Sequence, residues 1–137
     1  MQVYIGGAYN GKRQFVMNKL ASIPKEHVHF FDGIIPESSF TGKDYVILMN
    51  FEKLSLQYKG MPELVVAQQV VDRLSELEQQ TNVICICTDI GRGIVPLNPT
   101  DRFVRDCCGR IYQRLFQEAR SVTRIWYGIP EKIKGEL

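Results

Sequence analysis

No part of the sequence contains the ~20 consecutive apolar residues that a membrane-spanning helix requires. The first residues read as a strand, without the charged region and apolar stretch of a secretory signal. The sequence also has little excess of positive over negative charge: the formal net charge at pH 7 is only +2. A surface that coats nucleic acid would need more positive charge. We therefore expect a soluble, cytoplasmic protein that has neither a membrane nor a nucleic acid as its partner.

Cysteine occurs only four times, as the pairs Cys85/Cys87 and Cys107/Cys108, within segments that read as buried elements. In a chain without a secretory signal this arrangement predicts reduced thiols and excludes a disulfide framework. A zinc-binding module is an alternative use of the four thiols. It is disfavoured, because the adjacent cysteines diverge around a helix and the spacing is not typical of zinc sites.

The length of 137 residues and the apolar content of 45% suit a single domain, residues 1–137, with one core. Short runs rich in Val and Ile alternate with segments of helical period, which is typical of a parallel sheet covered by helices. The sequence thus predicts an α/β fold with a mainly parallel sheet of about five strands. We place these strands at residues 2–5, 27–31, 44–49, 82–88 and 122–127.

Three helices are expected among these strands. The first spans residues 12–21 and ends before Pro24, the second is announced by Pro62, and the third has Thr100 or Asp101 as its N-cap. The stripes expected to face the core are Phe15, Val16 and Leu20, then Leu64, Ala67, Val70, Val71, Leu74 and Leu77, and finally Val104, Cys107, Cys108, Ile111, Leu115 and Ala119. The link at residues 32–43 is rich in turn-forming residues, so we expect a loop there.

A glycine-rich turn follows the first strand and opens the first helix. It matches G-x-x-x-x-G-K, the pattern of a phosphate-binding loop (P-loop), in which backbone N–H groups surround phosphate oxygens and the lysine adds a positive charge. The candidate nucleotide-binding residues of this turn are Gly6, Gly7, Ala8, Tyr9, Asn10, Gly11, Lys12 and Arg13. The structural alternative is a tight strand-to-helix turn with a chance Gly-Lys pair.

The turn lacks the Ser or Thr that normally follows the lysine and binds Mg²⁺. Arg13 stands there instead, and a guanidinium is a donor only and cannot bind a metal. Two arrangements are open. Either Arg13 turns away and Mg²⁺ is held more weakly, or the guanidinium takes over part of the space and charge role of the metal. Both predict altered catalysis.

A second glycine loop follows the fourth strand, where a ligand of an open parallel sheet is expected. This loop and the helix after it contain Gly91, Gly93, Ile94, Val95, Pro96, Asn98, Arg102, Arg105, Asp106, Gly109 and Gln113. In these residues the chain resembles the adenosylcobinamide kinase/adenosylcobinamide-phosphate guanylyltransferase family of cobalamin biosynthesis. The turn at residues 6–12 also stands where that family has its P-loop. The resemblance covers both ends of the chain and is poor in the middle.

The resemblance implies a P-loop NTPase-like fold that binds ATP or GTP as its cofactor. Any Mg²⁺ would be held weakly, because Arg13 replaces the P-loop hydroxyl. The resemblance also implies a role in assembling the nucleotide loop of adenosylcobalamin, with adenosylcobinamide as a partner and a homotrimer as the assembly. Lys12 would stabilise the transferring charge, and Asp89 or Asp32 would assist the metal or the substrate hydroxyl. Beyond the first turn, the candidate nucleotide-binding residues are Asp32, Gly33, Asn50, Gly91, Gly93 and Arg102.

Three departures from the family pattern concern metal and covalent chemistry. The segment with the family's guanylylated histidine is absent, and the two histidines, His27 and His29, lie ahead of its position. Asn50 stands near the place of a family acid, and Arg13 replaces the P-loop hydroxyl. Two hypotheses follow: a kinase on adenosylcobinamide without guanylyl transfer, and a non-catalytic nucleotide-binding regulatory relative. For Arg105 and Asp106, ligand positioning and an exposed ion pair are both open.

Overall fold

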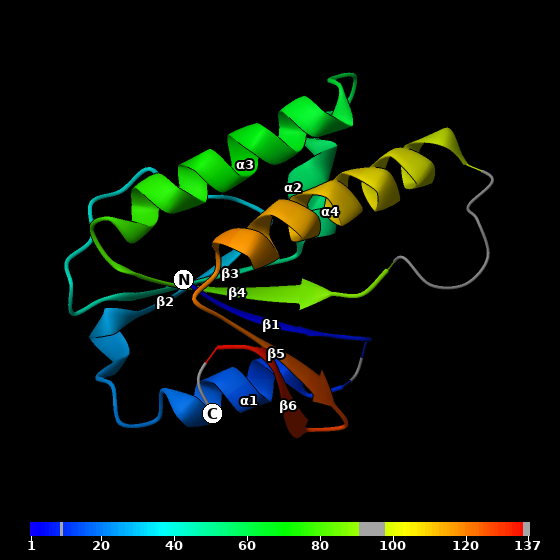
Figure 1. The fold of residues 1–137 in the computed structure, drawn as a ribbon. Coiled ribbons are helices and arrows are strands. Elements are labelled where there is room, and N and C mark those ends of the chain that lie inside the picture. Colours follow the sequence, from blue (N-terminus) through cyan, green and yellow to red (C-terminus); the bar gives the residue numbers. More distant parts are fainter. Residues whose placement is uncertain (9, 91–97, 136–137) are drawn as a thin grey trace.

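The computed structural model describes residues 1–8, 10–90 and 98–135, which form a layered α/β structure around one sheet (Figure 1). The strands are β1 (Gln2–Gly6), β2 (Val28–Asp32), β3 (Tyr45–Met49), β4 (Asn82–Thr88), β5 (Ser121–Trp126) and β6 (Ile129–Lys134). Their order in the sheet is β2-β3-β4-β1-β5-β6. Strands β1 to β5 are parallel to their neighbours, and β6 is antiparallel to β5. The predicted α/β fold with a mainly parallel sheet is confirmed, and the structure adds a sixth strand.

Helices cover both faces of this sheet. They are α1 (Lys12–Lys19), α2 (Phe51–Leu56), α3 (Glu63–Glu78) and α4 (Pro99–Glu118), with a short 3₁₀ turn at Lys25–His27. In Figure 1, α2, α3 and α4 lie above the sheet and α1 lies below it. The central strand β4 contributes buried side chains to both faces of the sheet, because successive side chains of a strand point to opposite faces. Cys85 and Cys87 pack with α3 and α4, whereas Ile84 and Ile86 pack on the side of α1.

Helix α3 buries one apolar stripe against β4 and α4. The buried residues of α3 are Val66, Ala67, Val70, Val71, Leu74 and Leu77. Burial of each Val or Leu side chain contributes about 1.5–3 kcal/mol. The predicted stripe is therefore correct except at its start. Leu64, in the first turn of α3, is 60% exposed, and the buried stripe begins at Val66.

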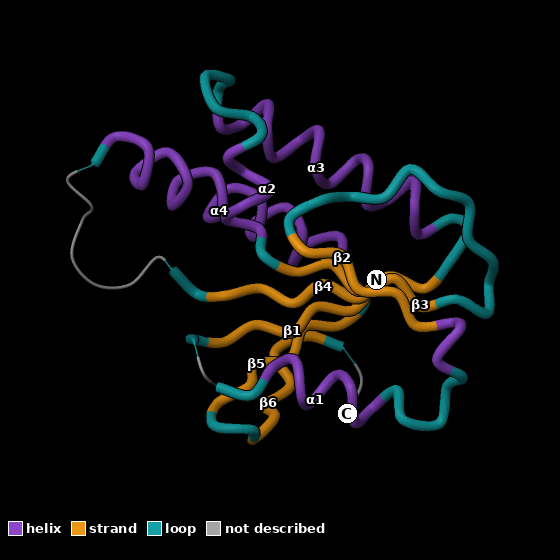
Figure 2. The backbone as a smooth tube through the Cα atoms, turned by 180° about the vertical axis from the view of Figure 1, so that it is seen from behind, coloured by secondary structure: helices purple, strands orange, loops and turns teal. Residues whose placement is uncertain are grey.

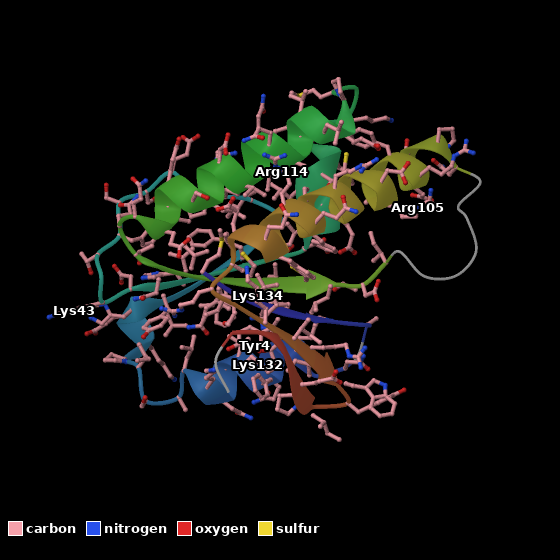
Figure 3. All side chains as sticks on the ribbon, viewed as in Figure 1. Tyr4, Lys43, Arg105, Arg114, Lys132 and Lys134 are labelled. Atoms are coloured by element: carbon pink, nitrogen blue, oxygen red, sulfur yellow. The ribbon has the colours of Figure 1, made fainter. Side chains whose placement is uncertain are left out.

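Helix α4 begins two or three residues earlier than expected. Its N-cap is Asn98, whose side chain accepts hydrogen bonds from the backbone N–H groups of Thr100 at 2.7 Å and Asp101 at 3.4 Å. Asn is as good an N-cap as Asp or Ser, so the prediction of Thr100 or Asp101 was wrong. At the other end, Nζ of Lys134 donates to the carbonyl oxygens of Phe116 and Gln117 at 2.9 and 2.7 Å (Figure 3). Strand β6 thereby satisfies the last carbonyls of the helix.

Two elements, α2 and β6, were absent from the prediction. Helix α2 has only six residues, too few for a helical period to be recognised. Strand β6 is exposed at every position and contains Pro130, so its sequence does not read as a strand. It forms because it pairs with β5 across a two-residue turn. The expected loop between β2 and β3 is confirmed, since residues 33–44, all described, contain no helix (Figure 2).

None of the helices in the described ranges combines the length and the apolar character needed to cross a membrane.

Candidate functional site

The carboxyl ends of the parallel strands meet at one edge of the sheet, where the turn after β1 enters α1. Ligands of open α/β sheets bind at this edge. Gly11, the N-cap of α1, has a φ of 80°, a left-handed conformation that glycine adopts without steric cost. The positive end of the α1 dipole points into the turn. The described residues of the turn thus combine a left-handed glycine with a helix N-terminus, two features expected of an anion site. Tyr9 lies outside the described residues.

Lys12 is the buried cation of this turn. It is 8% exposed and lines a pocket of about 470 Å³. Its Nζ donates to the carbonyl oxygen of Gly7 at 2.7 Å, so the side chain folds back over the turn. Burial lowers the pKa of Lys12, while Cys87 and Glu52 act in the opposite direction. A phosphate in the pocket would provide this buried ammonium group with an anionic partner.

The two glycines at the start of the turn serve different purposes. A Cβ on Gly6 would lie 2.3 Å from the carbonyl oxygen of Ile125, so glycine allows β1 and β5 to approach each other. A Cβ on Gly7 would lie 3.2 Å from Nδ2 of Asn10, a contact that a small side-chain movement would relieve. The next residue, Ala8, is exposed. Sheet packing therefore requires Gly6, a reason that the loop pattern does not contain.

Acidic and amide side chains also line the pocket of Lys12. Asp32 ends β2, Asn50 follows β3, and Glu52 lies in the first turn of α2. Nδ2 of Asn50 donates to the Asp32 carboxylate at 2.9 Å, and its Oδ1 accepts from the backbone N–H of Lys53 at 3.1 Å. Asn50 has a φ of 63° and is the N-cap of α2. It therefore holds Asp32 and starts α2 at the same time.

Sequence reasoning missed Glu52. This residue lines the pocket and lies near enough to Lys12 to raise its pKa. The sequence did contain a signal for a helix start here, because Asn50, a residue type common at N-caps, is followed two residues later by an acid. Such acids are typical of first helical turns. The signal was overlooked because no helix was expected immediately after β3.

Arg13, the residue in place of the P-loop hydroxyl, also lines this pocket. Its guanidinium carbon lies 4.7 Å from the centroid of the Phe30 ring, within the range of a cation–π interaction. Nη1 lies 3.8 Å from Sδ of Met49. These contacts hold the cation against β2 and β3. The guanidinium thus stays in the pocket wall, which is nearer to the second arrangement left open by the sequence than to a side chain that turns away.

The oxygen donors of the pocket fit a weakly held Mg²⁺. This ion is usually bound by one or two carboxylates together with the phosphates of a substrate. Asp32 and Glu52 are two such carboxylates on the wall of one pocket, and they would hold the ion with a nucleotide. Across the described ranges, no group of three or more His, Cys, Asp or Glu side chains could hold a metal ion. Phosphate oxygens would therefore have to complete the coordination.

Asp89 lies beside the first turn and in a different pocket from Lys12. Its backbone N–H donates to the carbonyl oxygen of Gly6 at 2.9 Å. Together with Gly7, Arg124 and Trp126 it lines a pocket of about 440 Å³ on the side of β5. The second loop was expected to lie next to the first, and the structure places its first residue, Asp89, beside the turn. Gly91 and Gly93, the other predicted binding residues of the second loop, lie in the range 91–97, which the structure does not describe.

Besides Ala8, two predicted binding residues that the structure describes, Gly33 and Arg102, line neither pocket. Gly33 has a φ of 73°, and the side chain of Lys53 occupies the space where a Cβ would lie. Its N–H donates to the carbonyl oxygen of Met49 at 2.8 Å, so it shapes the turn after Asp32. Arg102 is exposed in the first turn of α4. Among the described residues, neither makes a contact that supports nucleotide binding, and their assignment stays a prediction.

The two histidines lie at the amino end of β2, and Asp44 directly precedes β3, at the opposite edge of the sheet from the turn. Nδ1 of His27 and Nε2 of His29 both contact one carboxylate oxygen of Asp44, at 3.0 and 3.1 Å. The other carboxylate oxygen accepts from the backbone N–H of Thr41 at 2.8 Å. These hydrogen bonds, that of Thr41 first, hold the pKa of Asp44 far below its usual range. The histidines therefore contribute to structure at this edge, away from the P-loop-like turn.

Arg105 and Asp106 form an ion pair, with Nη2 and Oδ1 3.0 Å apart. They line a surface hollow between α3 and α4, beside a second ion pair in which Arg110 Nε lies 3.5 Å from Glu63 Oε1. Figure 3 shows Arg105 on the half of α4 that is remote from β6. Of the two uses left open for Arg105 and Asp106, the structure favours the ion pair.

The four thiols are all buried. Burial raises the pKa of Cys85 to about 12 and that of Cys107 and of Cys108 to about 11, so the thiols are neutral near pH 7. A zinc site needs thiolates. The structure therefore disfavours the zinc-binding alternative and agrees with reduced cysteines in the core.

Comparison with known proteins identifies the family. A model of the cobinamide kinase / cobinamide phosphate guanyltransferase family matches residues 46–133 of the 137-residue chain. The match includes the middle of the chain, where the motif comparison found little similarity, and it begins after the turn at residues 6–12. No curated protein matches the chain. Since the family match spans well over half of the chain, the protein belongs to the cobinamide kinase/cobinamide phosphate guanyltransferase family, whose role lies in cobalamin biosynthesis.

Proposed function

We propose that the chain binds the triphosphate of ATP or GTP at residues 6–12 and transfers the γ-phosphate to a hydroxyl group of cobinamide. One observation carries this proposal: the buried Lys12 shares a pocket with the carboxylates of Asp32 and Glu52. Phosphoryl transfer depends mainly on positioning and on stabilisation of negative charge. Lys12 and the amino end of α1 supply positive charge, and the two carboxylates supply sites for a metal or for a proton.

In the proposed step, the cobinamide oxygen bonds to the γ-phosphorus as the bond to the β–γ bridging oxygen breaks. The products are phosphorylated cobinamide and a nucleoside diphosphate. The hydroxyl proton passes to a carboxylate, for which Glu52, Asp32 and the predicted Asp89 are the candidates. Mg²⁺, when bound, would neutralise part of the phosphate charge. Arg13 in the pocket wall would add a fixed positive charge.

Guanylyl transfer through a histidine is not part of this proposal. The reaction needs an imidazole nitrogen next to the α-phosphate. His27 and His29 are hydrogen-bonded to Asp44 at the amino end of β2, whereas the turn lies at the carboxyl ends of the strands. Neither ring reaches the pocket that contains Lys12, which is lined by other residues.

A non-catalytic nucleotide-binding protein is the second candidate. The observation that favours it is the contact of Arg13 with Phe30, because a cation held there leaves the metal without its usual hydroxyl ligand. This candidate predicts thermal stabilisation by nucleotide that requires little Mg²⁺.

Transfer of labelled γ-phosphate from ATP or GTP to cobinamide distinguishes the two candidates. The proposal predicts label transfer in the wild type, loss of transfer in Lys12→Ala and normal transfer in Lys43→Ala, which removes an exposed lysine. Glu52→Gln, Asp32→Asn and Asp89→Asn then rank the three carboxylates. If nucleotide binds but no divalent metal supports transfer, the kinase proposal is wrong and the non-catalytic candidate stands.

The homotrimer implied by the resemblance stays a prediction, which light scattering of the purified protein would test.

A further inference from the structure

The turn between β5 and β6 presents two large aromatic side chains next to the P-loop-like turn. Trp126 is 62% exposed and Tyr127 is 73% exposed. Their ring centroids lie 5.5 Å apart at an interplanar angle of 65°. Exposure of two adjacent aromatic side chains leaves apolar area in water, and such a surface often marks a binding site.

This aromatic turn, defined as Trp126 and Tyr127, is attached to the phosphate side of the molecule. The backbone N–H of Gly128 donates to the carbonyl oxygen of Asn10 at 2.8 Å. Trp126 lines the 440 Å³ pocket with Gly6 and Gly7. Tyr127 lines a neighbouring pocket of about 390 Å³ with Asn10 and residues of α1. The two aromatic residues therefore border the P-loop-like turn on the side of Gly6, Gly7 and Asn10, where a nucleotide would bind.

The two sides of the turn differ in chemistry. The pocket with Lys12, Asp32 and Glu52 lies toward β2, β3 and β4 and is charged. The pockets of the aromatic turn lie toward β5 and α1, and Asn10 lines the pockets on both sides. A nucleotide whose γ-phosphate lies with Lys12 would extend its ribose and base across Asn10 toward the aromatic side chains.

The backbone of the aromatic turn gives a second, independent argument. Trp126 and Ile129 are paired, so Tyr127 and Gly128 form a two-residue hairpin turn with φ values of 48° and 79°. Such turns favour Asn-Gly, because both central residues need positive φ. A tyrosine with positive φ is strained, and strained residues are concentrated at ligand-binding sites. The strain therefore supports a function for the Tyr127 ring beyond folding.

We propose that the base of the bound nucleotide stacks on the aromatic turn, so that Trp126 and Tyr127 form the base-binding subsite. Aromatic faces bind bases by stacking, which any base can provide. The subsite therefore favours ATP and GTP over a bare polyphosphate without choosing between the two bases. This inference rests on the proposed binding of triphosphate at residues 6–12.

The test compares the dissociation constants of GTP, ATP and inorganic tripolyphosphate, measured by calorimetry. The wild type should bind the nucleotides more tightly than tripolyphosphate. In Trp126→Leu this advantage should fall about tenfold or more, with tripolyphosphate binding unchanged. Ile133→Ala, which alters an exposed residue of β6 outside these pockets, is the matched control. Tyr127→Asn should also lose part of the advantage while raising the melting temperature, because Asn suits the turn.

Fluorescence adds a direct readout, since Trp126 is the one tryptophan of the sequence. Its emission should be quenched by GTP and ATP and should not respond to tripolyphosphate. If tripolyphosphate and nucleotides bind equally well, or if Trp126→Leu and Tyr127→Asn leave the nucleotide advantage intact, the base subsite is refuted and triphosphate binding stands. If neither probe binds, both proposals fail. A smaller oligomer in Trp126→Leu with unchanged nucleotide advantage would instead assign the aromatic turn to a contact between copies.

Discussion

The side-chain amide of Asn50 donates a hydrogen bond to the carboxylate of Asp32 at 2.9 Å, and this contact connects the carboxyl ends of β3 and β2. The same side chain caps α2, whose first turn carries Glu52. One residue thus fixes the positions of both carboxylates in the pocket of Lys12. Asn50 was predicted to contact the nucleotide, and its position in the pocket wall is compatible with that prediction.

The first prediction concerns Asn50→Asp. The substitution replaces the amide donor with a carboxylate next to Asp32, so the free energy of unfolding without metal should fall by about 1 kcal/mol. A third carboxylate in the pocket should bind Mg²⁺ more tightly. The melting temperature of the variant should therefore rise more on addition of Mg²⁺ than that of the wild type. Asn50→Gly, which accepts the positive φ and adds no charge, is the control and should not gain a response to Mg²⁺.

The second prediction concerns the cation in the pocket wall. Arg13→Ser restores the hydroxyl that a P-loop uses to bind Mg²⁺ and removes the charge near Phe30. Calorimetry with GTP should give about tenfold tighter binding in the presence of Mg²⁺ and weaker binding in its absence, where the guanidinium charge is lost. Arg13→Gln removes the charge without adding a hydroxyl and should bind more weakly under both conditions. Equal gains in the two variants would contradict a metal-dependent role for the hydroxyl.

The third prediction concerns the packing role of Gly6. Gly6→Ala places a Cβ against the carbonyl oxygen of Ile125, so β1 and β5 must move apart. Overpacking of this kind costs about 1–3 kcal/mol, which urea unfolding would measure. Gly42→Ala is the matched control, because a Cβ there meets no atom within 4 Å. If Gly6→Ala unfolded at the same urea concentration as the wild type, the close approach of the strands would not matter for stability.

The fourth prediction concerns acid stability. In the folded protein the pKa of Asp44 is lowered by Thr41, His27 and His29. The unfolded chain therefore takes up a proton first as the pH falls, starting near the ordinary value of about 3.9. The contribution of Asp44 is fully present above about pH 5, and it should be lost progressively below that pH. Asp44→Asn should be less stable than the wild type at neutral pH and should show a flatter decline in acid. Asp72→Asn, a substitution on the exposed face of α3, should retain the wild-type decline.

Sequence patterns predicted the strands well because β1 to β5 are short apolar runs that local sequence defines. The elements that were missed depend on contacts between distant residues. Strand β6 is held by its pairing with β5 and by Lys134 on the carbonyls of α4. Helix α2 is held by Phe51 and Leu54, which pack in the same core as α3 and α4. A pattern read along the chain does not contain these contacts.

The amino-acid sequence by itself determined the α/β fold, the glycine-rich turn with Lys12 and the family resemblance that the comparison confirmed. These features depend on residue type and spacing, which are local properties. Only the tertiary structure decided which side chains surround Lys12. Asp32, Glu52 and the guanidinium of Arg13 come together because three parallel strands end at one edge of the sheet, and Trp126 joins the turn because β5 lies next to β1. Strand order is a property of the folded chain, and residues far apart in sequence become neighbours through it.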